Sequence, residues 1–405
     1  MADIKNFALN SNELLEEQIE ELGNSVAYRD ETIRVMPDGH PGKGAVVGST
    51  ITFSDKIAPY TVGVDICCRV SLFKLPAEFS VENDLEKLDE VVHNCLPTGF
   101  NVHSSEPIES CSFPYSDLKF WDTLDDAKKN RVRLSMGTLG SGNHMCSVDV
   151  DDDGNAYLLV HCGSRSLGVL MADYYQDIAK KAGEARVKEL RDRYHQLMCE
   201  LRDPNAAENN ETVRELLAEI DKDHVYLDGE DCNDYLSDML KLELWSLLNH
   251  HCIYYMICDG MGWDYGNMNE VSTTCVHNYA SVSEGIIRKG AISAHYGEIG
   301  IIPLNMRDGT LLVKGKGNPD WNYSLPHGAG RLMSRAEARK NVSLDEYEES
   351  MKDVYSTTVN IGSIDEAPMA YKNYKDIIDA IEPNAEILCH LREVYNYKDD
   401  TQKSH

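Results

Sequence analysis

The chain has 405 residues, of which 42% are hydrophobic, so it is long enough and apolar enough to bury a large core. Its formal net charge of −29 excludes a generic nucleic-acid binder, because contacts to phosphate need lysine and arginine, although a local basic groove remains compatible. Residues 1–19 show no basic start followed by an apolar run, and no stretch is apolar over the ~18 residues of a membrane span. We therefore expect a cytoplasmic protein without a membrane anchor.

Hydrophobic periodicity predicts blocks of helices and strands along the chain. The first helix is expected to be capped by Ser11 or Asn12. Helices are expected at residues 11–22, 81–95, 169–200, 233–258, 334–355 and 373–382. Strands are expected within residues 33–73, at 157–160 and within 271–315, and residues 101–120 are expected to form a loop. This pattern predicts an α+β fold.

The glycine-rich segments continue from residue 39 to residue 330 without a clear linker, so we expect a single large domain over residues 1–405. Residues 201–213, LRDPNAAENNETV, are polar and contain a proline, which is typical of a turn. We place there the edge of an inserted helical hairpin that covers residues 184–240 approximately.

Charge is distributed unevenly in the second half of the chain. Acidic residues dominate residues 203–238, whereas residues 314–340 hold six lysines or arginines against Asp320 and Glu337. Runs of this kind are usually solvated surfaces. The basic run carries more interest because it surrounds His327.

Four histidines share a sequence context that is typical of functional side chains. His144, His161, His277 and His327 each have glycine, asparagine or cysteine as a close neighbour, and two of them directly follow apolar, strand-like runs. The end of a strand can present a rigid side chain to a cleft. One such histidine alone is more often an ordinary core or surface residue, but four in one chain make that interpretation weaker.

A carboxylate and a thiol stand three residues apart in GVDICC, which follows another apolar run. Asp65 and Cys68, together with imidazoles, are side chains that bind zinc, manganese and neighbouring metals. A thiolate is able to bridge two ions, and five ligands for two ions leave open positions, as in a catalytic site. The residue types leave open both a metal site and a set of buried polar side chains. Twelve cysteines without a CxxC pair otherwise indicate buried thiols.

Two small-residue loops complete the set of candidate functional segments. HGAGR begins at His327, and a helix starting near Arg331 would offer free N–H groups to an anion. MPDGHPGKG, residues 36–44, contains Asp38, His40 and Lys43. Neither loop matches the P-loop pattern, so any nucleotide is expected to be held differently.

The ordered motifs of this chain resemble those of the RtcB family of RNA-splicing ligases. They are MPDGHPGKG, GVDICC, GTLGSGNH, VHCGSRSLG, VHNYA, RKGA, HGAGRLMSR and DEAPMAYK, and the resemblance runs from about residue 34 to Lys398. It implies the α+β architecture of that family, with the active site in a central cleft. It also implies an enzyme that joins an RNA ending in a 3′-phosphate or 2′,3′-cyclic phosphate to an RNA starting with a 5′-hydroxyl, in RNA repair or tRNA splicing. The implied co-substrate is GTP, the implied metal is a pair of Mn²⁺ ions, and archease is a possible activating partner; a monomer is our default.

The resemblance also implies a role for individual residues. His327 would attack the α-phosphate of GTP and carry GMP, and Asp38 would orient its imidazole. The implied metal ligands are Asp65, Cys68, His144, His161 and His277. The implied nucleotide contacts are Asn143, Ser147, Asn278, Pro303, Leu304, Asn305, Met306, Thr310, Gly328, Ala329, Gly330 and Lys398. The implied RNA contacts are Lys43 and Arg165, and the basic stretch around His327 would guide the RNA.

Five positions depart from the family pattern. Ser147 stands where the family has a guanine-binding glutamate, Asn305 and Thr310 replace serines, Arg69 replaces a glycine, and Met145 replaces an aromatic residue. The metal ligands and the nucleophile are intact, so these changes bear on selection of the base. Two other functions stay open: a metal-dependent RNA-end phosphoesterase without guanylylation, and a non-catalytic RNA-binding scaffold.

Overall fold

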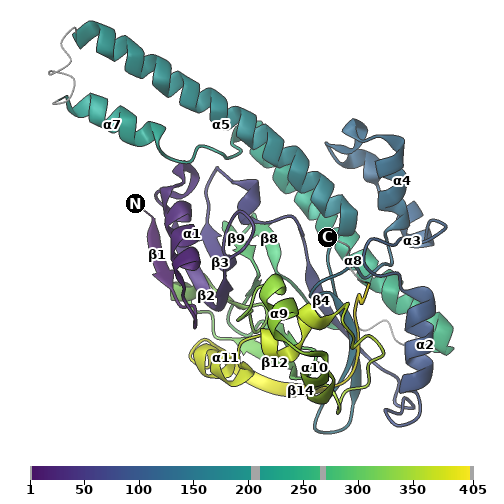
Figure 1. Cartoon of the computed structure of the whole chain (residues 1–405). Coiled ribbons are helices and arrows are strands. Elements are labelled where there is room, and N and C mark those ends of the chain that lie inside the picture. The colour runs from purple at the N-terminus through teal and green to yellow at the C-terminus, as the bar shows by residue number, and fades with distance from the viewer. Residues whose placement is uncertain (1, 202–209, 265–270, 402–405) are drawn as a thin grey trace.

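Two β-sheets form the body of the protein in this computed structural model, which describes residues 2–201, 210–264 and 271–401 (Figure 1). The smaller sheet has five strands in the order β1-β2-β3-β9-β8, and β1 and β2 are its parallel pair. Its strands are β1 (Asp3–Asn6), β2 (Thr32–His40), β3 (Val47–Thr52), β9 (Ile286–Lys289) and β8 (Asn278–Ser281).

The larger sheet has seven strands, and every neighbouring pair is antiparallel. In spatial order they are β11 (Ile299–Asn305), β12 (Gly309–Gly315), β14 (Ala385–Tyr397), β5 (Met145–Val150), β6 (Ala156–Cys162), β4 (Arg69–Lys74) and β7 (Val271–Val276). A separate pair is formed by β10 (Ala291–Ser293) and β13 (Ser324–Pro326).

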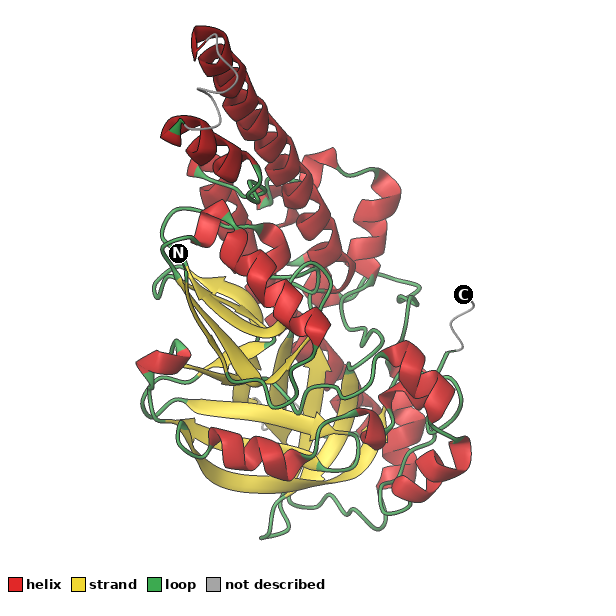
Figure 2. Ribbon diagram, turned by 60° about the vertical axis from the view of Figure 1, so that its left-hand side comes forward, coloured by secondary structure: helices red, strands yellow, loops and turns green. Residues whose placement is uncertain are grey.

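Helices surround these sheets, and the expected α+β class is confirmed (Figure 2). They are α1 (Glu13–Asn24), α2 (Leu85–Cys95), α3 (Ile108–Cys111), α4 (Asp126–Leu134), α5 (Arg165–Leu201), α7 (Glu211–Ile220), α8 (Gly229–Met261), α9 (Arg335–Asn341), α10 (Leu344–Ser350) and α11 (Tyr374–Ile381). Asn12 is the cap of α1, since its side chain accepts a hydrogen bond from the backbone N–H of Leu15 at 2.9 Å.

Two expectations about secondary structure are wrong. Residues 101–120 contain α3 and a short 3₁₀ turn instead of a plain loop, because Phe113, Tyr115 and Phe120 are buried in the core and hold the segment in place. Residues 334–355 form two helices instead of one. Ser343 begins the second helix with its own capping box, in which Glu346 bonds back to the backbone of Ser343.

A long helical arm projects from the body (Figures 1 and 2). The outer part of α5 and the shorter α7 lie side by side along this arm. The turn between them, residues 202–209, lies outside the described residues. The expected insertion at about 184–240 therefore stays a prediction.

Strand alternation separates an apolar face from a functional face in the larger sheet. On β6, Leu158 and Val160 face a core shared with α2 and α8, whereas Leu159 and His161 point to the opposite face. The neighbouring strand β5 follows the same rule, so Met145 shares the face of His161.

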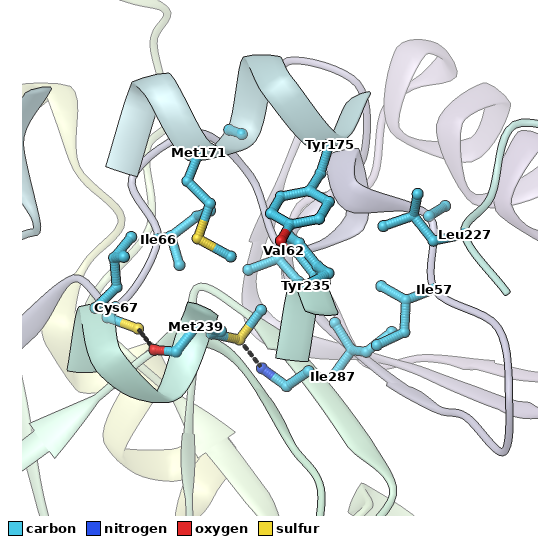
Figure 3. Close-up of a cluster of buried hydrophobic side chains, with 14 of the residues drawn as sticks. Ile57, Val62, Ile66, Cys67, Met171, Tyr175, Leu227, Tyr235, Met239 and Ile287 are labelled. Atoms are coloured by element: carbon cyan, nitrogen blue, oxygen red, sulfur yellow. Dashed lines mark hydrogen bonds between the residues drawn. The ribbon is translucent and has the colours of Figure 1, made fainter. Parts of the chain in front are cut away.

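A second core fixes the segment that precedes β4. Met171 of α5 lies beside Ile66 and Met239 of α8 beside Cys67, and Tyr175 of α5 lies beside Val62 (Figure 3). Cys67 has a φ of 57°, which is a strained value for a residue with a side chain, and its thiol donates to the carbonyl of Met239 at 3.5 Å. This packing holds Cys68, the next residue, in one position. Within the described parts of the chain, no helix is both long and apolar enough to cross a membrane.

The buried face of α8 predicts a large difference between two of its leucines. Leu242 is 0% exposed and Leu240 is 58% exposed. We expect Leu242→Ala to lower the free energy of unfolding by about 2–5 kcal/mol, because it leaves a cavity. Leu240→Ala, the matched control, should change it by less than about 1 kcal/mol. Urea unfolding followed by circular dichroism measures both, and equal losses would contradict the assigned faces of α8.

Candidate metal centre and active site

The five predicted metal ligands lie at one end of four adjacent strands. In the order β5-β6-β4-β7, all neighbours are antiparallel, so the start of one strand lies beside the end of the next. His144 precedes β5, His161 is near the end of β6, Cys68 precedes β4, and His277 follows β7. The register places Met145 and Val70 on either side of His161. Residues far apart in sequence thus converge.

Backbone contacts hold the ligand loops together. The N–H of Cys67 donates to the carbonyl of Asn278 at 2.7 Å, and the N–H of His277 donates to the carbonyl of Cys68 at 2.9 Å. Gly163 allows the loop after β6 to approach, because a Cβ at this position would lie 1.9 Å from Oδ1 of Asp65.

The ligand atoms form two groups that share one thiol. Cys68, His161 and His277 make one group, and Asp65, Cys68 and His144 make the other, with the atoms of each group within 4.8 Å of one another. The Nε2 atom of His144 lies 2.9 Å from Oδ2 of Asp65 and 3.5 Å from Sγ of Cys68. This nitrogen, oxygen and sulfur set fits two divalent cations bridged by Cys68.

The environment favours the ligand form of His161 and His277 but not of Cys68. Burial would lower the pKa of His144, but the Asp65 carboxylate outweighs burial and raises that pKa to about 9. Nδ1 of His144 lies 3.0 Å from the carbonyl oxygen of Leu139, a contact that fixes the ring by donation and leaves Nε2 toward Asp65 and Cys68. Burial and neighbouring imidazoles hold the pKa of His161 and of His277 well below the usual value, so both rings are neutral. Burial, reinforced by Asp65, raises the pKa of the Cys68 thiol, and a bound cation would oppose this by favouring the thiolate.

His327 is held by a buried carboxylate beside the metal ligands. Its Nδ1 atom lies 2.8 Å from Oδ2 of Asp38, which is 0% exposed. The centre of its ring lies 4.9 Å from that of His277. Gly330, with a φ of +73°, lets the loop that follows His327 lie against β2, because a Cβ there would be 2.2 Å from the carbonyl oxygen of Asp38. The predicted nucleophile is therefore close to the candidate metal centre.

A cavity of about 1020 Å³ opens over this centre. Among the metal ligands and the predicted nucleophile, Asp65, Cys68, His161, His277 and His327 line it. The predicted nucleotide and RNA contacts that line it are Lys43, Asn143, Asn278, Pro303, Leu304, Asn305, Gly328, Ala329, Gly330 and Lys398. Asn278 also ties the ligand loops together, because its side chain donates to the carbonyl of Asp65 and accepts from the N–H of Gly290.

Four predicted contacts do not line the cavity. Ser147 and Thr310 are 0% exposed, and Met306 is buried and accepts from the hydroxyl of Tyr347 at 3.0 Å. Arg165 lies at the start of α5 and donates to the hydroxyl of Thr138 and the carbonyl of Gly99. The roles implied for these residues stay predictions.

Sequence reasoning missed Lys289 and His40 as cavity residues. Lys289 donates to the carbonyls of Lys43 and Tyr60, and burial lowers its pKa to about 8. His40 lies 3.0 Å from the carbonyl oxygen of Asp38, and burial lowers its pKa to about 4. Lys289 lies in RKGA and His40 lies in MPDGHPGKG, so both belong to segments that the sequence singles out. Neither segment, however, indicates what these two side chains do.

The basic run around His327 is partly neutralised. Arg331 and Arg335 pair with Glu366 at 3.3 and 2.6 Å, and Arg339 pairs with Asp365 at 3.0 Å. Burial would raise the pKa of Glu366, but Arg335 and its other cationic neighbours hold it at about 2. Lys314 also pairs with Glu386 at 3.7 Å, so four of the six cations in this run are paired and the expectation that the run guides RNA is weakened.

The helix that would have offered free N–H groups near Arg331 starts instead beside residue 334, where the hydrophobic periodicity predicted it. The helix α9 begins at Arg335, and Ser334 and Glu337 satisfy its first N–H groups through a capping box. Arg331 instead forms a β-bridge with Tyr371.

A buried acidic pair lies beside the predicted base contacts. Glu393 of β14 stands directly opposite Asp149 of β5, on the strand face that also carries Ser147. Oδ2 of Asp149 and Oε2 of Glu393 have no hydrogen-bond partner among the described residues. Burial raises the pKa of Asp149 to about 6, and burial together with the Asp149 charge raises the pKa of Glu393. Two carboxylates this close in the interior do not both ionise at neutral pH.

Comparison of the amino-acid sequence with known proteins identifies a family. The model of the family described as tRNA-splicing ligase RtcB matches residues 24–399. The RNA-splicing ligase RtcB of Escherichia coli K12 is 28% identical over 390 residues, which cover 89% of this chain and 88% of that protein. The tRNA-splicing ligase RtcB of Nanoarchaeum equitans is 25% identical, over 85% of this chain and 83% of its own length. The chain belongs to the RtcB family of RNA-splicing ligases.

The shared thiol predicts how metal content responds to substitution. After equilibration with Mn²⁺ and desalting, Cys68→Ala should lose both ions, because it belongs to both ligand groups, whereas His144→Ala should lose about one of the two. Cys146→Ala, a buried cysteine on β5 that faces the α8 core, is the matched control and should keep both. Elemental analysis by mass spectrometry measures the content. Retention of both ions by Cys68→Ala would show that the thiolate is not shared.

The acidic pair predicts a pH-dependent loss of stability. The folded-state pKa values lie above those of the unfolded chain, so the stabilising effect of the bound protons is complete below about pH 4 and falls as the pH rises through about 6 and beyond. Glu393→Gln removes one charge and should make this fall smaller. Urea unfolding over a pH series measures it. Glu386→Gln, an exposed glutamate on the same strand, should keep the wild-type slope, and an unchanged slope in Glu393→Gln would refute the assignment.

Proposed function

We propose that this protein joins RNA ends, using GTP and two Mn²⁺ ions, through a covalent His327–GMP intermediate. The substrates would be an RNA with a 3′-phosphate or 2′,3′-cyclic phosphate and an RNA with a 5′-hydroxyl, in RNA repair or tRNA splicing. The observation that carries this proposal is the hydrogen-bonded pair of His327 and Asp38 at the wall of the cavity, next to His277.

The pair has the geometry of an activated nucleophile. Because Nδ1 of His327 faces the carboxylate of Asp38, the proton resides there and the lone pair is on Nε2. Attack by Nε2 makes the ring cationic, and the buried carboxylate stabilises that charge. A phosphoesterase has no need of this arrangement beside its metal ligands.

The proposed reaction has three displacements at phosphorus, after water has opened any 2′,3′-cyclic phosphate to a 3′-phosphate and a 2′-hydroxyl. Nε2 of His327 forms a bond to the α-phosphorus of GTP, and pyrophosphate leaves. The 3′-phosphate oxygen of the RNA then takes the GMP and frees the imidazole. The 5′-hydroxyl of the second RNA finally attacks the activated 3′-phosphate, and GMP leaves as the phosphodiester forms.

The chain supplies positions for the charged groups of this reaction. Asp65, Cys68, His144, His161 and His277 would hold the two metal ions, which neutralise phosphate charge and orient it for in-line attack. Lys43 and Lys289 line the same cavity and add positive charge, and Lys398 also lines it but pairs with Glu366 at 3.6 Å. Lys398 donates to the carbonyl of Asn143 at 3.4 Å, which keeps its ammonium at the cavity wall.

Ser147 and Thr310 are buried and do not line the cavity. Selection of guanine is therefore proposed from the resemblance alone. A monomer and a cytoplasmic location are proposed as defaults, and a requirement for archease is proposed from the resemblance.

Incubation with α-labelled GTP and Mn²⁺, followed by denaturation, tests the intermediate. We expect acid-labile label on the wild-type protein and none on His327→Ala. Asp38→Asn should form label roughly 100-fold more slowly or worse, because the imidazole loses its orienting carboxylate, with metal content unchanged. His295→Ala, a partly exposed histidine after β10, should label normally.

One result would overturn the proposal in favour of the metal-dependent phosphoesterase. It is the absence of label with any nucleotide, combined with intact hydrolysis of RNA ends.

A further inference from the structure

Phe100 is an aromatic side chain that takes no part in the packing of the fold. It is 81% exposed and belongs to none of the hydrophobic clusters of the described chain. A phenylalanine placed in water forgoes the stabilisation that burial would give it. Its position in the loop between α2 and α3 is nevertheless rigidly set, because the N–H of Gly99 donates to the carbonyl of Gly140 at 2.8 Å.

The side chain of Arg165 connects this loop to the candidate metal centre. Arg165 donates through Nη2 to the carbonyl of Gly99 at 2.9 Å. The same guanidinium lies beside His144, since a Cβ on Gly140 would be 1.9 Å from Nη1 of Arg165 and 2.7 Å from Nδ1 of His144. Arg165 therefore links Gly99, the neighbour of Phe100, to the surroundings of the predicted metal ligand His144.

Two arginines hold the backbone of the loop at Phe100, and one carboxylate lies beside it. Arg131 of α4 donates to the carbonyl of Phe100 at 2.6 Å, and no described carboxylate lies within ion-pair distance of Arg131 or Arg165. The nearby carboxylate is that of Asp399, which lies against Gly99 and accepts from the hydroxyl of Thr401 at 2.6 Å. Both guanidinium groups spend donors on carbonyl oxygens, so they keep their charge for phosphate.

We propose that Phe100 is a stacking platform for a base of the single-stranded RNA near its reacting end, with Arg131 and Arg165 contacting the adjoining phosphates. An exposed aromatic side chain, in a loop whose backbone is held by two arginines that have no described ion-pair partner, offers the combination that binds single strands, namely base stacking plus backbone charge. This inference rests on the proposed function, because it assigns a place to the RNA of that reaction. It goes beyond it by naming a surface outside the cavity.

Binding and ligation measurements on Phe100→Ala test the platform. The probes are a short fluorescent RNA ending in a 3′-phosphate and one starting with a 5′-hydroxyl, each bound by the metal-loaded full chain. We expect Phe100→Ala to weaken binding of one of them, and to raise its KM in ligation, roughly 5- to 100-fold, as for the loss of one stacked base. Phe100→Trp should restore both values, whereas Phe100→Leu should not.

An abasic substitution in the RNA separates stacking from a general effect. One RNA lacks the base nearest the reacting end, and another lacks the next base. One of these two RNAs should bind wild type as weakly as the complete RNA binds Phe100→Ala. The same RNA should bind Phe100→Ala no more weakly than the complete RNA does. Tyr296→Ala, which removes an aromatic side chain that is 87% exposed, is the matched control and should bind as wild type does.

Formation of the labelled His327 intermediate involves no RNA. It therefore tests the proposed function separately from the Phe100 platform. Phe100→Ala should form label at the wild-type rate, because an exposed side chain contributes little to stability. Wild-type label and ligation with unchanged RNA affinity and KM in Phe100→Ala would overturn the platform alone and would leave Phe100 to a protein partner. Absence of label from wild type would overturn the proposed function itself.

Discussion

The antiparallel register of four strands is the constraint on which the site depends. Strands β5, β6, β4 and β7 are hydrogen-bonded side by side, and each carries or adjoins a metal-ligand residue at the same end of the sheet. A shift of one residue in the pairing of β6 with its neighbours would turn His161 toward the apolar core of α8. The ligands are therefore placed by the hydrogen bonding of the larger sheet, and the loops only close around them.

The predicted nucleophile comes from the other half of the fold. His327 follows β13, and its partner Asp38 lies in β2 of the smaller sheet. The cavity lies where these elements meet the ends of the larger sheet. The predicted metal ligands are held by the larger sheet, whereas the predicted nucleophile is held by β13 and β2. The close packing of Gly330 on β2 helps to fix the position of His327 relative to the ligands.

The electrostatics explain how an acidic protein is compatible with RNA. The overall charge is −29, yet the charges near the site are sorted. Arg331, Arg335 and Arg339 are neutralised by Asp365 and Glu366, which stabilise the wall of the cavity. Arg131 and Arg165 bond only to neutral oxygens. Net charge thus says little about an RNA surface, since unneutralised local cations decide it.

The sequence determined the class of fold and the residue types of the site. The period of the apolar residues was sufficient for α5 and α8, and the small-residue context was sufficient to select the four histidines, because both signals are local. The strand β14 was not predicted, since its two register shifts disturb the alternation that marks a strand. The resemblance implied that Asp38 meets His327, whereas the tertiary structure decided that Cys68 belongs to two ligand groups and that Ser147 and Thr310 are buried away from the cavity. These are contacts between residues far apart in the chain, and only strand order and register bring them together.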